Sequence, residues 1–186
     1  MIRKALSSIL KTFPGTEDAE LPALLLLSEL ETKNAKIAPT PDKKELYYSL
    51  ALKYYGIAMD RYPASGEASM GMANTYMVVE DYSKAILIFR EVAGYSSWKK
   101  LHAEAYVRIG QCYYNMGKFD LASSFFQKTY VSFLRYYDWA AQSYLWHART
   151  LKKLGKAADA RAVLQEAIKN PKIRETPAFP ELNSEL

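Results

Sequence analysis

The sequence predicts an all-α protein in which antiparallel helix pairs follow one another along the chain. Three observations predict this fold class. Ala, Leu, Lys, Glu and Tyr dominate the 186 residues, whereas long alternating runs of Val, Ile and Thr are missing, and this composition favours helix. Apolar residues make up 49% of the chain and charged residues 24%, the balance of a soluble globular protein. One pattern of small, aromatic and turn residues also occurs three times, as it does in repeat proteins.

The clearest copy of the pattern runs from Ala103 to Phe126. Small residues at fixed positions let two helices approach closely, and the large side chains between them contribute about 1.5–3 kcal/mol each when fully buried. The pattern residues of this copy are Tyr106, Ile109, Gly110, Tyr113, Gly117, Ala122 and Phe126. Similar residues lie 37 positions earlier and 38 positions later: Met72, Ala73, Tyr76, Tyr82, Ala85 and Phe89, and then Tyr144, Ala148, Leu151, Gly155, Ala160, Leu164 and Ala167.

These spacings resemble the tetratricopeptide repeat over about residues 45–171. The resemblance implies an α-solenoid of antiparallel helix pairs wound into a right-handed superhelix. We expect three repeats in residues 64–170, at about 66–99, 103–136 and 141–171. Because a single helix pair cannot bury its apolar face alone, neighbouring pairs must stack.

The two ends of the chain fit the pattern poorly. Residues 1–63 predict partial repeats, with a polar loop near 32–44. Residues 2–13 look like the second helix of a still earlier repeat, so we expect the chain to be a fragment of a larger bacterial protein. Pro177 and Pro180 interrupt residues 171–186, which predicts an extended tail.

No group of residues predicts an enzyme, a metal site or a cofactor site. His102 and His147 are interpreted as satisfied core or edge histidines, and Cys112 as a small buried apolar residue. The chain lacks the spaced His and Cys residues that zinc requires, and it has no Gly-rich phosphate loop or nucleophile elbow. We therefore predict no catalysis, no metal and no cofactor.

The resemblance implies a partner-binding groove lined by the first helix of each repeat. When the family's groove positions are transferred to this sequence, the side chains at those positions change along the chain from apolar, through carboxamide, to basic. A peptide could place apolar side chains on the Met and Val surface, bond its backbone to Asn74 and Gln111, and place an acidic group by Arg149. The implied groove residues are Met70, Asn74, Met77 and Val78 in the first repeat, Val107, Gln111, Tyr114 and Asn115 in the second, and Leu145, Arg149, Lys152 and Lys153 in the third.

The leading functional prediction is a non-catalytic scaffold for protein–protein interaction. Chaperone-binding members of the family clamp a carboxylate with Lys, Asn, Asn, Lys and Arg, and only Asn74 fits that set here. Two alternatives stay open: a helical-repeat protein that binds nucleic acid, which a net charge of only +5 favours weakly, and a structural subunit that self-associates through its N-terminal helices. Phe13-Pro14 and Tyr62-Pro63 resemble turns in bacterial envelope scaffolds, which implies a periplasmic location, although cytoplasmic relatives use the same turn.

Overall fold

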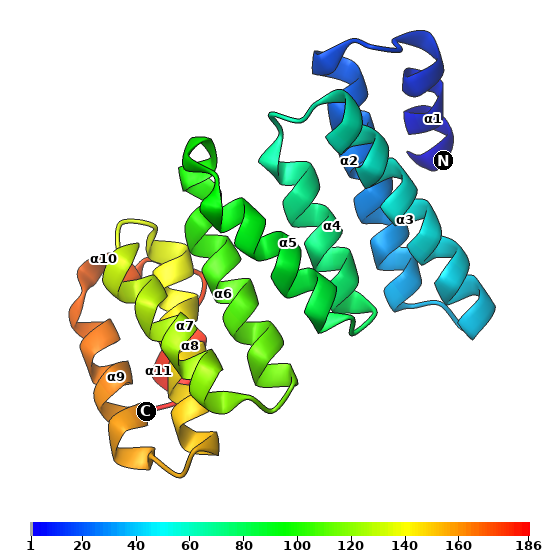
Figure 1. The fold of residues 1–186 in the computed structure, drawn as a ribbon. Helices are drawn as coiled ribbons and strands as arrows, with labels where there is room; N and C mark the ends of the chain where they lie inside the picture. Colours follow the sequence, from blue (N-terminus) through cyan, green and yellow to red (C-terminus); the bar gives the residue numbers. More distant parts are fainter. Residues whose placement is uncertain (1) are drawn as a thin grey trace. The chain divides into compact units, whose positions relative to one another are not determined.

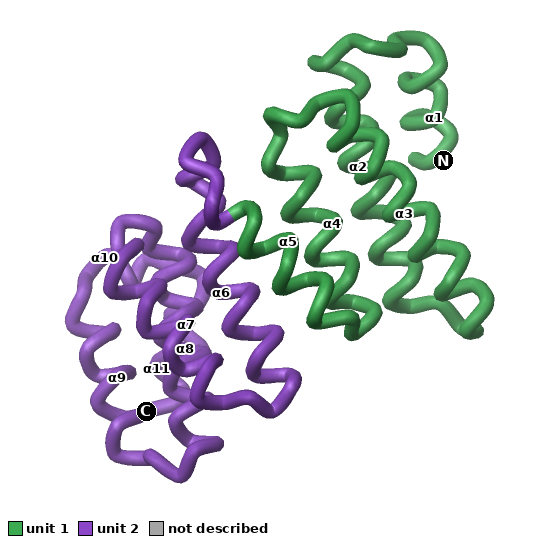
Figure 2. The backbone as a smooth tube through the Cα atoms, viewed as in Figure 1, with its two compact units in different colours: residues 1–92 green, residues 93–186 purple. Residues whose placement is uncertain are grey.

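The computed structural model describes residues 2–186, which form helices and contain no strand. The predicted all-α fold of antiparallel helix pairs is therefore confirmed (Figure 1). The chain divides into two compact units, residues 1–92 and 93–186 (Figure 2). This division differs from the predicted change of organisation at residue 63, because helices on both sides of that residue pack together in unit 1.

Unit 1 is organised around one long helix, α2 (Glu17–Lys36), which contacts three other helices of the unit. Leu24 and Leu27 on α2 are fully buried, and Tyr55 and Ala58 pack against Leu24. The remaining helices are α1 (Ile2–Thr12), α3 (Pro41–Arg61), α4 (Gly66–Val78) and α5 (Tyr82–Gly94), the last of which ends two residues beyond the division between the units.

Unit 2 consists of two helix pairs followed by two short helices. Each helix of the pairs contacts the next one in sequence, and α6 also contacts α8, so the pairs stack. The elements are the 3₁₀ turn η1 (Ser96–Trp98), α6 (Lys99–Asn115), α7 (Phe119–Ser132), α8 (Tyr137–Lys153), α9 (Ala157–Lys169), α10 (Pro171–Arg174) and α11 (Phe179–Ser184).

The same tight turn ends the first helix of three successive pairs. A residue with left-handed backbone lies at its centre: Glu80 (φ 66°), Gly117 (φ 72°) and Gly155 (φ 75°). The amide after each of them donates back to the last turn of the helix over 2.9 Å, from Asp81 to Tyr76, from Lys118 to Tyr113 and from Lys156 to Leu151. This is the hydrogen-bond pattern of a Schellman C-cap, and it reverses the chain so that the second helix runs antiparallel to the first.

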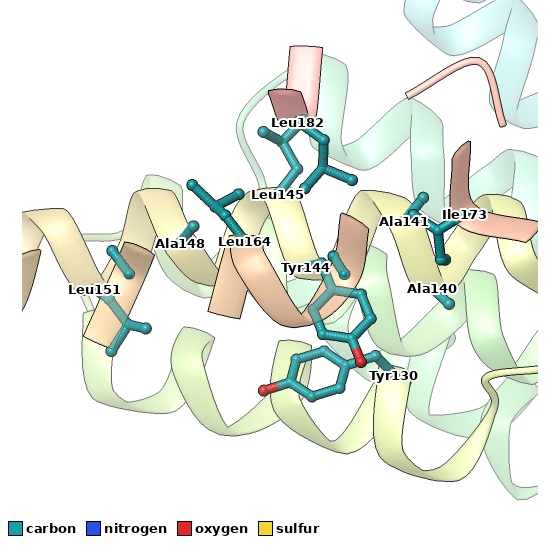
Figure 3. Packing of buried hydrophobic residues seen from close by; sticks show 12 residues of the cluster. Tyr130, Ala140, Ala141, Tyr144, Leu145, Ala148, Leu151, Leu164, Ile173 and Leu182 are labelled. Carbon is teal, nitrogen blue, oxygen red and sulfur yellow. The ribbon is translucent and has the colours of Figure 1, made fainter. Parts of the chain in front are cut away.

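Close approach of the paired helices depends on a small residue, as the sequence pattern predicts. A Cβ added at Gly110 of α6 would lie 2.5 Å from the ring of Phe126 on α7, and that ring is fully buried. The core of unit 2 continues through α8 and α9 to the C-terminal segment (Figure 3). Its large members include Leu145, Leu164 and Leu182.

The predicted polar loop near residues 32–44 is largely helical, and this expectation was wrong. α2 continues to Lys36, and α3 already begins at Pro41. Ala35 is buried on the same face as Leu27, and buried Glu31 pairs with Arg3, so packing stabilises the last turns of α2. The Thr40 hydroxyl accepts a hydrogen bond from the Lys43 amide at the start of α3.

The predicted extended tail is also a correction, because residues 171–186 form α10 and α11. The Asn170 side chain caps α10 by accepting from the Lys172 amide over 2.9 Å, and Pro171 occupies a first-turn position. Pro180 likewise lies in the first turn of α11, where its missing N–H costs no helical hydrogen bond. Ile173 and Leu182 are fully buried, and they anchor the two helices to unit 2.

Candidate functional site

The residues predicted to line a groove differ in how accessible they are. The side chains of four of them are buried: Met70, Val107, Gln111 and Leu145. Those four stabilise the fold and cannot contact a partner in this conformation. The accessible members in unit 1 are Asn74, Met77 and Val78, all half-buried on α4. In unit 2 they are Tyr114, Asn115, Arg149, Lys152 and Lys153.

Aromatic and cationic side chains gather on the first helices of the two pairs in unit 2. We call this the α6–α8 face and define it by Arg108, Tyr114, Trp139, Trp146 and Arg149. The Arg108 guanidinium lies 5.4 Å from the Trp139 ring, and the Arg149 guanidinium lies 5.4 Å from the Trp146 ring. Tyr114 meets Trp146 edge-on at 5.3 Å. All five side chains are half-buried, so each is held in place and still reaches solvent.

Arg108 is held by neighbours on its own helix. It donates to the Gln111 carbonyl oxygen over 3.1 Å and to the Glu104 carboxylate over 3.4 Å. Burial raises the pKa of Glu104 above its ordinary value, and the charge of Arg108 opposes that rise. The Arg108 side chain is therefore fixed against Trp139.

The basic end of the predicted groove is occupied by the chain's own C-terminal segment. Arg149 donates to Glu181 over 2.5 Å and to Glu185 over 3.0 Å, and Lys152 donates to the Glu185 carboxylate over 2.7 Å. The hydrogen bond from Lys152, supported by Arg149, lowers the pKa of Glu185. Burial alone would lower the pKa of Arg149, but the two glutamates raise it. The acidic groups beside Arg149 and Lys152 in the structure therefore belong to the same chain.

A cavity of about 440 Å³ opens where the loop between α7 and α8 meets α10. Trp139 of the α6–α8 face lines it together with Thr176 and with aromatic and charged side chains from both sides, namely Arg135, Tyr136, Tyr137, Asp138, Lys172 and Glu175. The C-terminal segment therefore contributes one wall of the hollow beside Trp139.

His147 is a core histidine with both ring nitrogens in hydrogen bonds. Nε2 lies 2.8 Å from the Ser123 hydroxyl, and Nδ1 lies 3.0 Å from the Tyr130 hydroxyl. Burial lowers the pKa of His147 to about 4, so the imidazole is neutral at pH 7 and is a weak base toward Ser123. The buried thiol of Cys112 has its pKa raised to about 12 by burial, so it is not activated as a nucleophile.

Within residues 2–186 no cluster of His, Cys, Asp and Glu has the arrangement of a metal site. None of the helices described there combines the length and the apolar character that crossing a bilayer requires.

Three residues of the α6–α8 face are not among the groove residues predicted from the sequence: Arg108, Trp139 and Trp146. That prediction follows the family's groove positions, and successive helical residues lie about 100° apart around the axis. A shift of one residue therefore separates buried Val107 from half-buried Arg108, and buried Leu145 from half-buried Trp146. The available signal was compositional, because two of the three tryptophans lie on the first helix of one pair.

Sequence models of the tetratricopeptide repeat match two segments of the chain, residues 103–128 and residues 142–172. No curated protein sequence matches. Among solved structures, a MamA mutant is similar with a TM-score of 0.55 and 15% identity, over 90% of this chain and 87% of that chain. A chain of the APC/C hetero-tetramer Cut9–Hcn1 is similar with a TM-score of 0.53 and 16% identity, over 98% of this chain and 39% of that chain.

Both matched segments lie in unit 2 and begin in the first helix of a pair. The structural likeness, at such low identity, supports the fold, and the repeat matches identify its sequence pattern. Stacked helix pairs of this kind are scaffolds for protein interaction. Residues 103–128 and 142–172 are therefore tetratricopeptide repeats.

Proposed function

We propose that this protein is a non-catalytic scaffold that binds a peptide or a segment of a protein partner along the first helices of its repeats. The observation that carries the proposal is the α6–α8 face, where two tryptophans, a tyrosine and two arginines are held half-buried. Trp, Tyr and Arg are the residue types that most often dominate the binding energy of protein interfaces.

The contacts on this face suggest how a partner segment is recognised. Trp139 and Trp146 offer flat apolar surface, and their fixed positions reduce the conformational entropy that binding costs. Arg108 supplies positive charge beside Trp139, and Arg149 does so beside Trp146, so a segment with apolar and acidic side chains matches the surface. In unit 1 the accessible Asn74 and Met77 of α4 are proposed as a separate contact surface, suited to a peptide backbone and an apolar side chain.

The test is a quantitative pull-down from an extract of the source organism, with partners identified by mass spectrometry. We expect Trp139→Ala and Arg108→Gln to reduce capture of the partners of the unmodified chain by at least about tenfold, because a truncated hot-spot residue costs about 2 kcal/mol or more. Val131→Ala is the matched control, since Val131 is an exposed apolar residue on the second helix of a pair, α7.

Circular dichroism and melting curves must first show that each variant is folded. If the Trp139 and Arg108 variants then capture the same partners as strongly as Val131→Ala does, groove binding at this face is wrong.

Self-association through the N-terminal helices stays a prediction. Ile2 and Phe13, at the two ends of the first helical segment, are 67% and 50% exposed, and this apolar exposure supports it. Sedimentation of the full chain at high concentration should reveal a dimer. A monomer throughout would remove this possibility.

A further inference from the structure

We propose that the surface formed by α8 and α9 is a receptor for a short acidic amphipathic helix of a partner, and that residues 171–186 occupy it as an internal competitor. The inference rests on the proposed function, because it names the partner chemistry at the basic end of the same groove. The receptor surface is defined by Leu145, Arg149, Lys152 and Leu164.

The C-terminal segment lies where the first helix of another pair would lie. α8 contacts both helices of the pair before it, α6 and α7, and in the same way α10 and α11 contact both α8 and α9. Figure 3 shows Leu182 beside Leu145 and Leu164, and Ile173 beside Ala141. The stacking surface of the last pair is thus covered by a segment too short to form a helix pair itself.

The recognition chemistry is specific in charge and in spacing. Glu181 and Glu185 are four residues apart, so their side chains lie on one face of the segment. Arg149 donates to both carboxylates, while Lys152 donates to the Glu185 carboxylate and to its backbone carbonyl. Leu182 is fully buried next to these ion pairs. The receptor surface therefore recognises an acidic residue, the leucine next to it and a second acidic residue one helical turn later.

The C-terminal segment is bound weakly enough to be replaced. α10 has four residues and α11 has six, far below the roughly 12–15 residues at which an isolated helix becomes even marginally stable. Within residues 171–186 only Ile173, Thr176 and Leu182 are buried. Glu181 is 56% exposed on its side chain, and ion pairs in contact with solvent contribute little.

A partner with the same charge and leucine pattern on a longer helix has an advantage over this segment. More of its helix is formed before binding, so it loses less conformational entropy on docking. The internal segment nevertheless lowers the apparent affinity of the partner, because only the fraction of molecules with an open surface can bind. Loosening residues 171–186 should therefore raise the apparent affinity of the protein for the partner, without any change in the receptor surface.

The test uses the full chain and a fluorescent, alanine-based helical peptide of about 20 residues that carries Glu-Leu-x-x-Glu. The double variant Glu181→Gln, Glu185→Gln loosens the internal segment and leaves the receptor intact. We expect fluorescence anisotropy to show at least tenfold tighter binding by this variant than by the unmodified chain. Arg149→Gln added to the double variant should weaken binding at least tenfold. Lys156→Gln is the charge-matched control, because Lys156 is exposed in the turn after α8, and it should change binding less than threefold.

Three results with the peptide would overturn the proposal, provided that circular dichroism shows folded variants. They are absence of peptide binding by the double variant, binding that survives Arg149→Gln, and equal binding of a peptide with Gln in place of both Glu residues. Dimerisation of the double variant in sedimentation, with no peptide bound, would assign the surface to a second copy and overturn it as well. If the pull-down with Trp139→Ala succeeds while the peptide fails, the proposed function stands and only this inference falls.

Discussion

Glu80 has a left-handed backbone, with φ 66°, at a turn where the next two helix pairs have glycine. Among residues 2–186 it is the only residue other than glycine with a positive φ. A side chain in this region brings its Cβ close to the carbonyl oxygen and costs roughly 1–2 kcal/mol. The turn keeps the same hydrogen bonds as the turns at Gly117 and Gly155, so the geometry of the helix pair outweighs the local preference.

Glu80→Gly should therefore stabilise the protein by about 0.5–1 kcal/mol, because glycine adopts this backbone without a Cβ clash. Urea unfolding followed by circular dichroism measures the change. Glu80→Ala is the matched control, since it removes the carboxylate and keeps the Cβ. Equal stabilisation by both variants would show that charge, and not backbone strain, is the cause.

His147 should make the free energy of unfolding depend on pH, at pH values above those at which carboxylates usually titrate. Burial lowers its pKa to about 4 in the folded state, whereas an unfolded histidine has a pKa near 6.5. Between these values the unfolded chain binds more protons, so stability falls as pH falls. The groups around the imidazole are Ser123 and Tyr130 on α7 and the Glu166 carboxylate on α9, which bonds to Tyr144 on α8.

We expect a loss of about 1–2 kcal/mol between pH 7 and pH 5, measured by urea unfolding at fixed ionic strength. His147→Asn should remove most of that slope, although its stability at pH 7 falls as well. An unchanged slope in His147→Asn would mean that other groups produce the pH dependence.

At the scale of the element, the close contact of α6 with α7 depends on one missing Cβ. The Cβ of an alanine at position 110 would lie 2.5 Å from the Phe126 ring. This ring also stacks on the Trp146 ring of α8, at a centroid distance of 6.3 Å. Because the ring is fully buried, it cannot move without disturbing its neighbours.

Gly110→Ala should therefore destabilise the protein by about 1–3 kcal/mol, the usual cost of overpacking, even though alanine has the higher helix propensity. Thermal melting measures the loss. Gly56→Ala on α3 is the control, because a Cβ there meets no atom within 4 Å and should be neutral or stabilising. A neutral result for Gly110→Ala would mean that the helix pair is looser than the structure indicates.

The elements that the sequence predicted are those whose signals are local. The turns at Gly117 and Gly155 and the small residues Gly110 and Ala148 follow from spacing along the chain. The helices at residues 171–186 did not follow, because Pro177 and Pro180 were interpreted as breakers. Pro180 lies in a first helical turn, and the segment depends on the burial of Leu182 by distant residues.

The candidate site was predicted only in part, for a related reason. The groove positions transferred from the family resemblance include Val107, Gln111 and Leu145, but packing buries those side chains. Arg149 and Lys152 are predicted to bind an acidic group of a partner, and in the structure they pair with carboxylates of the same chain. Glu185, which supplies one of these carboxylates, lies 33 residues after Lys152 in the sequence. No local sequence pattern specifies a contact over that separation.

At the scale of the whole molecule, each compact unit has a core of its own. Leu24 is buried with Tyr55 and Ala58 in unit 1, and Leu164 is buried with Leu145 and Leu182 in unit 2. In a repeat protein, stability is approximately the sum of terms for individual repeats and their immediate neighbours. Stability should therefore be local to a unit and need not be shared by the whole chain.

Leu24→Ala and Leu164→Ala form a matched pair for testing this, because each removes a leucine that is at most 1% exposed. Each should cost about 2–5 kcal/mol, and native-state hydrogen exchange should show the loss in the helices of its own unit. Amides of the other unit should keep their protection within about 0.5 kcal/mol, the additivity expected of distant sites. If either substitution lowers protection equally from α2 to α9, the protein unfolds as one cooperative body, and the local account of its stability is wrong.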